Sequence, residues 1–478
     1  MTTHDSSLPA AHFANTNISS ELQLARFVVH TTLAEVPNSA LQTIKWVVLA
    51  VMGTGVAGAW EEGIAELRSL LVERGGKPEA TSLLFGDALP ATSAAQLNAA
   101  MCRALDYCDA MAPGPHFGSA IVPAAFALAQ ARGGCSGTDL LEALVVGAEI
   151  GARFNLSERM YDGFDPTGIA GVFAATATAS RLLALNEVQT VNALALAFNR
   201  CGGSFQSHVD GSLAVRLVQG FVAETGVWCA QMAARGLTGP KNFLDGHYGY
   251  RHLYAKGLRE SASFTDGLKT RWLLETIVFK KYPSCGVTQG VTNQTLELIA
   301  ELNLRPSDLE YAEVRLPPYA TKLVGSPFVM GDNPRVNAQF SAQYCVANAV
   351  WRRSSKLDHF RPSAIAEAGL QALISKVKVI ADPGMDIRGH SAVDLMIQSR
   401  DGRSARRSYD VSPGFPGRGL SASEHQTRFE DCMAYASARA LEAGRPGTQS
   451  ALGASAILAM VESLQQQDNV VPFWASIR

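Results

Sequence analysis

The first part of the chain is patterned for α-helices. Between about residues 20 and 277, apolar residues recur every three or four positions, and Ala, Leu and Val are abundant. Ser136 stands directly before one such apolar face, where a hydroxyl group can cap a helix. The apolar segments 175–185 and 220–233 carry many small residues, so we expect buried helices that approach one another closely. The pattern predicts a large helical body.

The pattern changes after about residue 278. Residues 311–316 and 375–380 alternate between apolar and polar positions, as half-buried strands do. Two further alternating segments flank Asp401 and Gly402, a pair that is typical of a hairpin turn. These segments predict a small β-sheet that follows the helical body.

The changes of pattern predict a mainly α fold, in which a large all-helical domain carries an inserted, smaller α+β lid domain. The helical domain would comprise residues 20–277 and 416–465, because helical spacing returns after a break rich in Pro and Gly. The lid domain would span residues 278–415, and residues 1–19 and 466–478 would be tails. A cleft between two domains is a common place for a ligand.

Composition narrows the class of protein. With 47% hydrophobic and 18% charged residues, the chain can form a large core and is not a disordered or fibrous protein. The net charge of -2 gives no basic surface for nucleic acid or an anionic membrane. The eight cysteines form no C-x-x-C pair and are expected to be reduced thiols of a cytoplasmic protein. No signal peptide is seen, and the longest largely apolar run, 46–60, is too short to span a membrane.

Gly53, Gly55 and Gly58 match the G-x-G-x-x-G pattern of dinucleotide-binding proteins. That motif requires a strand before the glycines and a helix that opens within them, followed by alternating strands and helices. Here the chain continues with helical spacing alone. A glycine-rich helix packed closely against its neighbours is the favoured interpretation, and a nucleotide site is the alternative.

Apart from these glycines, the sequence shows no motif for a metal ion or a cofactor. The ten histidines are scattered, and His247 and His252 are five residues apart, which does not suit a metal-binding pair on a helix. The chain contains neither a G-x-S-x-G nucleophile motif nor a phosphate-binding P-loop. We therefore expect an enzyme that uses no metal ion and no organic cofactor.

One segment combines acid–base groups with a turn. Asp106, Asp109 and His116 lie in a stretch rich in Gly and Pro that leads into an apolar helix. Two carboxylates and an imidazole on such a loop can meet a substrate near a helix N-terminus, where anions bind. The alternative is that both carboxylates only cap or solvate the turn.

A basic cluster marks the point where helical spacing gives way to strands. Lys280 and Lys281 lie there, directly before the sequence Tyr-Pro-Ser-Cys. With Arg216 and Arg153 they could hold the carboxylates of a small polycarboxylic acid, although the sequence does not show that the four side chains converge. An exposed basic turn is the alternative interpretation.

Taken together, these segments resemble the MmgE/PrpD family, which includes 2-methylcitrate dehydratases, cis-aconitate decarboxylases and an iminodisuccinate epimerase. The resemblance extends from about residue 20 to residue 465. The loop that begins at Leu105 reads LDYCDAMAPGPHFGSAIVPA, and the helix that begins at Gly163 reads GFDPTGIAGVFAATATAS. The basic cluster reads KKYPSC, and residues 339–347 read QFSAQYCVA. The order and spacing of these segments match the family's pattern.

The resemblance implies a helical body, an α+β lid and a cleft between them, in a homodimer without a metal ion or an organic cofactor. The family's shared chemistry is movement of a proton at a carbon beside a carboxylate, with loss of water, loss of carbon dioxide or inversion. By position, His116 would donate or accept the proton, and Lys280 would neutralise a substrate carboxylate or act as the base. Asp106 would orient His116 or a substrate hydroxyl group, and Tyr344 would donate a hydrogen bond from the lid.

The chain also departs from the family's pattern. Ala110 and Ala112 stand where many relatives have a Thr and a His, and Asp165 replaces the His of the family's G-F-H-P-T segment. Arg216 lies beside the position of a family lysine and could replace its charge, and Cys285 aligns near a histidine of some decarboxylating members. The candidate catalytic residues are Asp106, His116, Asp165, Lys280 and Tyr344, and the candidate substrate-binding residues are Arg216, Lys281 and Cys285.

Three functions are open on this evidence. The first is a lyase or isomerase that transfers a proton beside a carboxylate of a small di- or tricarboxylic acid, different from the family's best-known substrates. The second is a standard activity, 2-methylcitrate dehydration or cis-aconitate decarboxylation. The third is a catalytically silent homologue with a binding or scaffold role. The first is favoured, because Asp106, His116, Lys280 and Tyr344 are retained while neighbouring positions differ.

Overall fold

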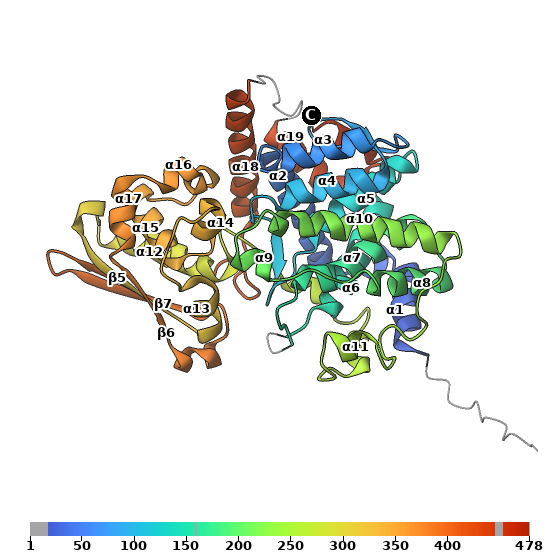
Figure 1. The fold of residues 1–478 in the computed structure, drawn as a ribbon, viewed down its shortest axis with the longest axis horizontal. Coiled ribbons are helices and arrows are strands. Elements are labelled where there is room, and N and C mark those ends of the chain that lie inside the picture. The colour runs from blue at the N-terminus through green and yellow to red at the C-terminus, as the bar shows by residue number, and fades with distance from the viewer. Residues whose placement is uncertain (1–17, 158–159, 445–452, 478) are drawn as a thin grey trace, which may run out of the picture.

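The computed structural model describes residues 18–157, 160–444 and 453–477. Most of these residues lie in helices, which confirms the mainly α class. Figure 1 shows a helical lobe on the right and a sheet lobe on the left, with helix α18 (Ala422–Glu442) between them. Each lobe has its own large hydrophobic core. The function of the sheet lobe as a lid stays a prediction.

The helical lobe is built around helix α7, which packs between α6 and α10. A Cβ atom at Gly226 of α10 would lie 2.5 Å from Cβ of Ala175 and 2.6 Å from the backbone carbonyl carbon of Ala175. Only glycine permits this spacing, which confirms the close approach of helices predicted from their small residues. The helices of this lobe before residue 277 are α1 (Ser20–His30), α2 (Asn38–Gly58), α3 (Ile64–Arg74), α4 (Ala91–Arg103), α5 (Gly118–Ala131), α6 (Gly137–Phe154), α7 (Pro166–Leu182), α8 (Glu187–Phe198), α9 (Gln206–Val209), α10 (Ala214–Ala234) and α11 (Tyr250–Leu253).

Helix α2 contains the three glycines of the G-x-G-x-x-G pattern. It runs unbroken through them, so a helix rather than a strand leads into the glycines, and the packed-helix interpretation is confirmed. A Cβ atom at Gly58 would lie 2.0 Å from the backbone oxygen of Met101 in α4. By length and composition α2 could cross a membrane, but here most of its residues are buried and it packs against α4 and α18 as a core helix.

Two short antiparallel sheets interrupt the lobe that was predicted to be entirely helical. Strand β1 (Ala80–Thr81) pairs with β2 (Ala88–Leu89), and β3 (Asp109–Met111) pairs with β4 (Ile277–Phe279). Strands of two or three residues are too short to show an alternating pattern in the sequence. The β3–β4 pair joins segments that are far apart in the chain.

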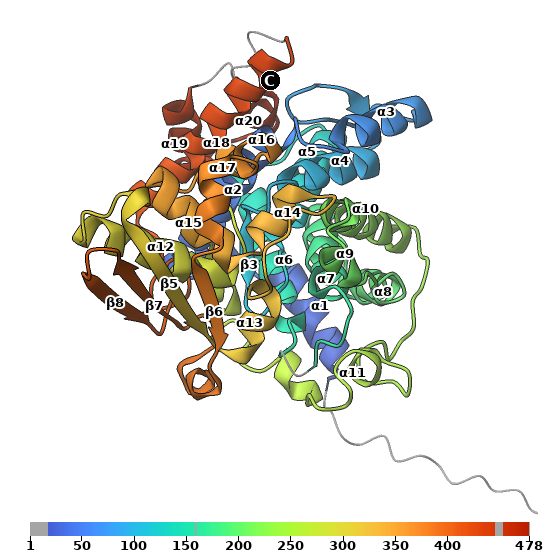
Figure 2. The same cartoon turned by 60° about the vertical axis from the view of Figure 1, so that its left-hand side comes forward.

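The sheet lobe contains a four-stranded sheet in the order β6-β5-β7-β8. Strand β6 is parallel to β5, and the other neighbouring strands are antiparallel. β7 and β8 form the hairpin predicted around Asp401 and Gly402, and the two other predicted strands are present as β5 and β6. Val393, Leu395 and Ile397 of β7 are buried, and helices α12 and α15 cover that face of the sheet (Figure 2). The elements are β5 (Leu309–Leu316), β6 (Val377–Ala381), β7 (Val393–Ser399), β8 (Ser404–Tyr409), α12 (Gln289–Glu301), α13 (Pro318–Val324), α14 (Pro334–Gln339), α15 (Ala342–Arg352), α16 (Pro362–Ile365) and α17 (Ala368–Ile374).

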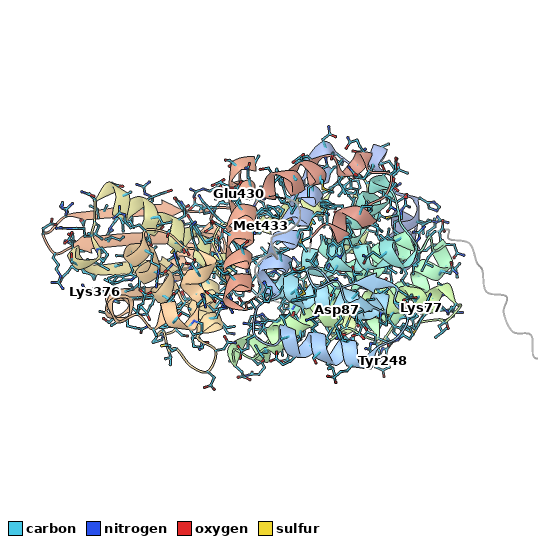
Figure 3. The ribbon with its side chains drawn as sticks, turned by 90° about the horizontal axis from the view of Figure 1, so that it is seen from above. Lys77, Asp87, Tyr248, Lys376, Glu430 and Met433 are labelled. Carbon is cyan, nitrogen blue, oxygen red and sulfur yellow. The ribbon has the colours of Figure 1, made fainter. Side chains whose placement is uncertain are left out.

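After the sheet, the chain returns to the helical lobe. Phe429 and Ala436 of α18 belong to the core of the helical lobe, and α18 packs against α2. Figure 3 shows α18 from above, with Glu430 and Met433 on it, between the side chains of the two lobes. Helix α19 (Ala454–Glu462) continues this packing against α2.

The sequence pattern predicted a tail over residues 466–478, but the described part, 466–477, packs against the helical lobe. Its helix α20 (Val471–Ala475) buries Phe473 and Trp474, and Trp474 stacks on Phe126 of α5 with ring centroids 4.4 Å apart. The helix is too short to show a helical period, but its apolar side chains complete the core beside α5. Of the other predicted tail, residues 1–17 lie outside the described residues.

Candidate active site

A cavity lies between the two lobes and holds about 720 Å³ of empty space, part of it open to solvent. Charged side chains reach it mainly from the helical lobe, apolar ones come from both lobes, and Tyr319, Phe340 and Phe415 come from the sheet lobe. A concave site with convergent polar groups is the expected place for a small ligand. The lining residues that bear on chemistry are Arg103, Asp106, His116, His208, Lys280, Tyr319, Leu323, Phe340 and His390.

One wall of the cavity is formed where α4 ends and where β3 pairs with β4. α4 ends at Arg103, and the chain turns at Asp106, whose φ of 50° lies in the left-handed region that Asp tolerates. Asp109 of β3 is then paired with Phe279 of β4. Because of this pairing, Lys280 comes to lie beside Asp106.

Arg103, Asp106 and Lys280 form a buried charged cluster. The Asp106 carboxylate makes an ion pair with Nη1 of Arg103, and its Oδ2 lies 2.8 Å from Nζ of Lys280. Nζ of Lys280 also donates a 2.9 Å hydrogen bond to the backbone oxygen of Asp106. Burial opposes ionisation of Asp106, but the charges of Arg103 and Lys280 outweigh burial and lower the pKa of this carboxyl group below its ordinary value. With two cations and one anion, the cluster has a net charge of +1.

His116 lines the same cavity, and its ring orientation is fixed. Nδ1 lies 2.6 Å from the backbone oxygen of Asp109, and Nδ1 carries the proton because a carbonyl oxygen can only accept. The backbone N–H of His116 donates to Oγ1 of Thr167, and its carbonyl oxygen accepts from Gln219. Burial, followed by the charges of the two neighbouring cations, lowers the pKa of His116 well below 6.5. The imidazole is therefore neutral at pH 7, and Nε2 can accept a proton.

Asp109 has a different role from Asp106. Its Oδ2 accepts a 2.9 Å hydrogen bond from the backbone N–H of Gly118, the first residue of α5. A Cβ atom at Gly118 would lie 2.3 Å from Oδ1 of Asp109, so this contact requires glycine. Burial raises the pKa of Asp109. Of the two alternatives that the sequence left open, Asp109 therefore holds the start of a helix, while Asp106 faces the cavity.

Two family models match most of the chain. The MmgE/PrpD N-terminal domain matches residues 22–261, and the MmgE/PrpD C-terminal domain matches residues 282–445. The chain belongs to the MmgE/PrpD family. The resemblance that the sequence motifs carried is thereby confirmed.

Relatives of this MmgE/PrpD protein include cis-aconitate decarboxylases. Human cis-aconitate decarboxylase is 27% identical over 416 residues, which cover 82% of this chain and 83% of the relative. The cis-aconitate decarboxylase-like protein oryM of Aspergillus oryzae is 25% identical over 433 residues, which cover 84% of this chain and 87% of the relative. The mouse cis-aconitate decarboxylase is 26% identical over 357 residues, 71% of each chain. At these identities, the relatives support an enzyme of the lyase kind.

Some of the site residues predicted from the sequence do line the cavity of this MmgE/PrpD protein. Burial raises the pKa of Cys285 to about 11, so its thiol is uncharged at pH 7. Asp165 lies directly before the lining residue Pro166, and its Oδ1 caps α7 by accepting the backbone N–H groups of Thr167 and Gly168. The predicted residues that line the cavity are Asp106, His116, Lys280 and Cys285.

Tyr344 and Lys281 are not among the lining residues. Tyr344 of α15 lies in the core of the sheet lobe, where its hydroxyl group donates to the backbone oxygen of His359. Lys281 makes a 2.9 Å ion pair with Glu424 in the first turn of α18. Tyr344 therefore packs its own lobe, and Lys281 joins β4 to α18.

The four cations that could have converged on one substrate are separated in the structure. Arg216 donates to the backbone oxygen of Glu62, and Arg153 is fully buried in a 2.8 Å ion pair with Glu149 one helical turn earlier. Among the described residues, Lys280 alone of the four lines the cavity. Arg153 and Arg216 make contacts within the helical lobe, and Lys281 connects the end of β4 to α18.

Arg103 and His208 are cavity residues that were not predicted from the sequence. Arg103 had a signal, because it stands three residues before Asp106 at a helix end, a spacing that allows an ion pair. His208 had none, because the short helix α9 belongs to no motif. Its place in the cavity depends on how α9 packs.

Within residues 18–157, 160–444 and 453–477, no group of three or more His, Cys, Asp and Glu side chains is placed to hold a metal ion. The expectation of a reaction without a metal ion or cofactor stays a prediction.

Proposed function

We propose that this MmgE/PrpD protein is a lyase that moves a proton at the carbon next to a carboxylate of a small carboxylic acid. The observation that carries the proposal is the neutral imidazole of His116 in one cavity with the cluster of Arg103, Asp106 and Lys280. An unprotonated base near a site of positive charge suits proton removal from carbon, because the cations stabilise the anion that forms.

The charge of the cluster limits the class of substrate. Its net charge of +1 suits one carboxylate at the cluster. Among the described residues that line the cavity, Arg103 and Lys280 are the only Arg or Lys side chains, and Met111, Val278 and Phe415 make part of the wall apolar. A tricarboxylate would leave charges without a partner cation, which is costly in a buried site. We therefore propose a substrate with one or two carboxylate groups.

Each residue of the site then has a defined role. Nε2 of His116 accepts the proton from carbon, and Lys280 and Arg103 hold the substrate carboxylate and the negative charge that develops on it. Asp106 positions both cations. In a dehydration, the C–H electron pair becomes the C=C bond, and the C–O electron pair leaves with a proton as water.

We also propose that the sheet lobe acts as a lid. Its Tyr319, Phe340 and Phe415 complete the wall of the cavity, and exclusion of water there would strengthen the electrostatic contacts of the cluster. The homodimer, the cytoplasmic location and the absence of membrane, nucleic-acid and cofactor partners stay predictions.

Proton NMR in deuterated water tests the proposed function. The purified protein is mixed with methylcitrate, citrate, cis-aconitate, malate and 3-hydroxybutyrate in turn. We expect one of the mono- or dicarboxylates to lose a C–H signal beside a carboxylate or to form a product. Water loss identifies a dehydratase, carbon dioxide loss a decarboxylase, and exchange without net product an isomerase. A protein that neither exchanges nor converts any of these acids would contradict the proposal.

The variants His116→Asn and Lys280→Met test the assigned roles. We expect His116→Asn to lower kcat by about 100-fold or more, because a general base contributes that much. Lys280→Met should mainly raise KM, because it removes a cation that holds the carboxylate. The matched controls are His30→Gln and Lys269→Met, whose side chains lie in surface ion pairs outside the cavity. Full activity in folded His116→Asn protein would show that His116 is not the base.

Decarboxylation of cis-aconitate is a second candidate, which the comparisons favour. The human, Aspergillus oryzae and mouse relatives cover 71% to 84% of the chain. cis-Aconitate has three carboxylates, so this activity would need groups beyond Arg103 and Lys280 to stabilise its charge. Carbon dioxide release from cis-aconitate in the same NMR experiment would establish it.

A further inference from the structure

His208 lines the cavity but has no part in the roles assigned above. It lies on the short helix α9, and its side chain is 11% exposed. The imidazole stacks on Phe205 with ring centroids 4.5 Å apart, and it makes a T-shaped contact with Phe340 from the sheet lobe, with ring centroids 6.0 Å apart. The ring is therefore held in one orientation between the two lobes.

One ring nitrogen of His208 faces a carboxylate. Nδ1 lies 3.9 Å from Oδ2 of Asp165 and has no hydrogen-bond partner in the described part of the chain. Asp165 is itself fixed, because its Oδ1 accepts the backbone N–H groups of Thr167 and Gly168. A proton on His208 would therefore be stabilised by an ion pair at Nδ1, and Nε2 would be available to a bound molecule.

The surroundings of His208 keep it neutral in the unliganded protein. Burial is the largest effect, and the positive charge of Arg103 adds to it. The carboxylates of Asp165 and Asp106 oppose this shift, and the charge of Lys280 adds to it. The net result is a pKa of about 4 for His208. A substrate carboxylate bound at the cluster would offset the two cations. Anion binding therefore favours a proton on His208.

We propose that His208 is the proton donor of this site and that binding of the substrate anion loads it with a proton. The inference rests on the proposed function. When a carboxylate binds at Arg103 and Lys280, His208 takes up a proton from solvent and pairs with Asp165. It then donates the proton from Nε2 to the substrate, while His116 remains the base.

The proton balance holds for both lyase reactions. In a dehydration, His116 accepts the proton from carbon, the C–H electron pair forms the C=C bond, and the C–O pair leaves as water with the proton of His208. In a decarboxylation, the C–C electron pair stays on the substrate carbon as carbon dioxide leaves, and the proton of His208 forms the new C–H bond. His208 is neutral at the end of both reactions, and it takes up a new proton from solvent when the next anion binds. After a dehydration, His116 returns its proton to solvent.

NMR of protein labelled with ¹³C at the histidine Cε1 position tests the loading step directly. The His208 signal is assigned by its loss in His208→Asn, and its pKa is measured with and without saturating propionate, a carboxylate that carries a single charge. We expect propionate to raise the pKa of His208 by about two units or more, because its charge counters that of Arg103 and Lys280 and a smaller rise would leave the imidazole neutral near pH 7. The shift should be smaller in Asp165→Asn, and the signal of the exposed His252 should not respond.

Kinetics on the substrate found in the NMR panel test the donor role. We expect His208→Asn to lower kcat by about 100-fold with little change in KM, and Asp165→Asn to shift the pH profile of kcat. His252→Asn is the matched control.

An unchanged His208 pKa with propionate, or a wild-type kcat in His208→Asn, would overturn this inference while leaving the lyase proposal standing. If no acid in the panel exchanges or reacts, the lyase proposal itself is wrong, and the donor role falls with it. If His208→Asn does not fold, His208→Gln replaces it in both the signal assignment and the kinetics.

Discussion

His425 illustrates how burial sets the charge of a single residue in this protein. It is 3% exposed on α18 and stacks on Trp46 with ring centroids 4.4 Å apart. Burial, with the charge of Arg428 added, lowers its pKa to about 3. In the unfolded chain a histidine has a pKa of about 6.5. Below pH 6.5 the unfolded chain therefore binds a proton that the folded protein does not, and the free energy of unfolding falls as the pH is lowered toward 3.

We expect the wild-type protein to lose about 2 kcal/mol more stability than His425→Gln between pH 7 and pH 5, because the variant has no proton to bind at this position. Urea unfolding at the two pH values measures the difference. His252→Gln is the control and should keep the wild-type pH dependence, since this side chain is exposed in the folded protein. Equal pH dependence in His425→Gln and the wild type would contradict the assignment.

Among the elements, the contact between α7 and α10 depends on a single glycine. The atoms that a Cβ at Gly226 would meet include the backbone of Ala175 and Thr176, which cannot move without shifting α7. We expect Gly226→Ala to destabilise the protein by about 1–3 kcal/mol, the usual cost of overpacking a core. Thermal unfolding measures it. Gly419→Ala is the control, because no atom lies within 4 Å of a Cβ built there. A Tm equal to that of the control would mean that α10 adjusts freely.

In the molecule as a whole, a buried ion pair joins the two lobes. Nη2 of Arg335, on α14 of the sheet lobe, lies 3.2 Å from Oε2 of Glu61 in the helical lobe. Arg335 also donates a 3.1 Å hydrogen bond to the hydroxyl group of Tyr435 on α18, and that hydroxyl group donates to Glu61 at 2.6 Å. Loss of Arg335 would leave the carboxylate of Glu61 buried without its cation.

We therefore expect Arg335→Met to lower the free energy of unfolding by about 3–5 kcal/mol, the usual cost of removing one partner of a buried ion pair. It should also make the connection between the lobes more sensitive to protease. Thermal unfolding and limited proteolysis measure the two effects. Arg305→Met is the control, because Arg305 also pairs with a carboxylate, that of Asp308, but its own side chain is exposed to solvent. A wild-type Tm for Arg335→Met would show that this pair does not hold the lobes together.

Local periodicity was enough to identify much of the fold. The helical class, strands β5 to β8 and the turn at Asp401 and Gly402 all leave patterns over a few consecutive residues, and the structure confirms them. The short strands β1 to β4 and helix α20 leave no such pattern, and they were missed or assigned to a tail. Order and spacing of motifs were also enough to identify the family, because these survive at low sequence identity.

The composition of the site depended instead on contacts between distant segments. The β3–β4 pairing brings Lys280 to Asp106, and the packing of α9 brings His208 to the same cavity. Lys281 is adjacent to Lys280 in the chain, yet it pairs with α18, and Tyr344 is used in the core of its own lobe. Lys280 and Lys281 both follow the end of β4, and each charged side chain binds the partner that the fold brings near. The residue types that could do the chemistry were therefore visible in the chain, whereas their convergence on one cavity followed from the packing of elements that are far apart in the sequence.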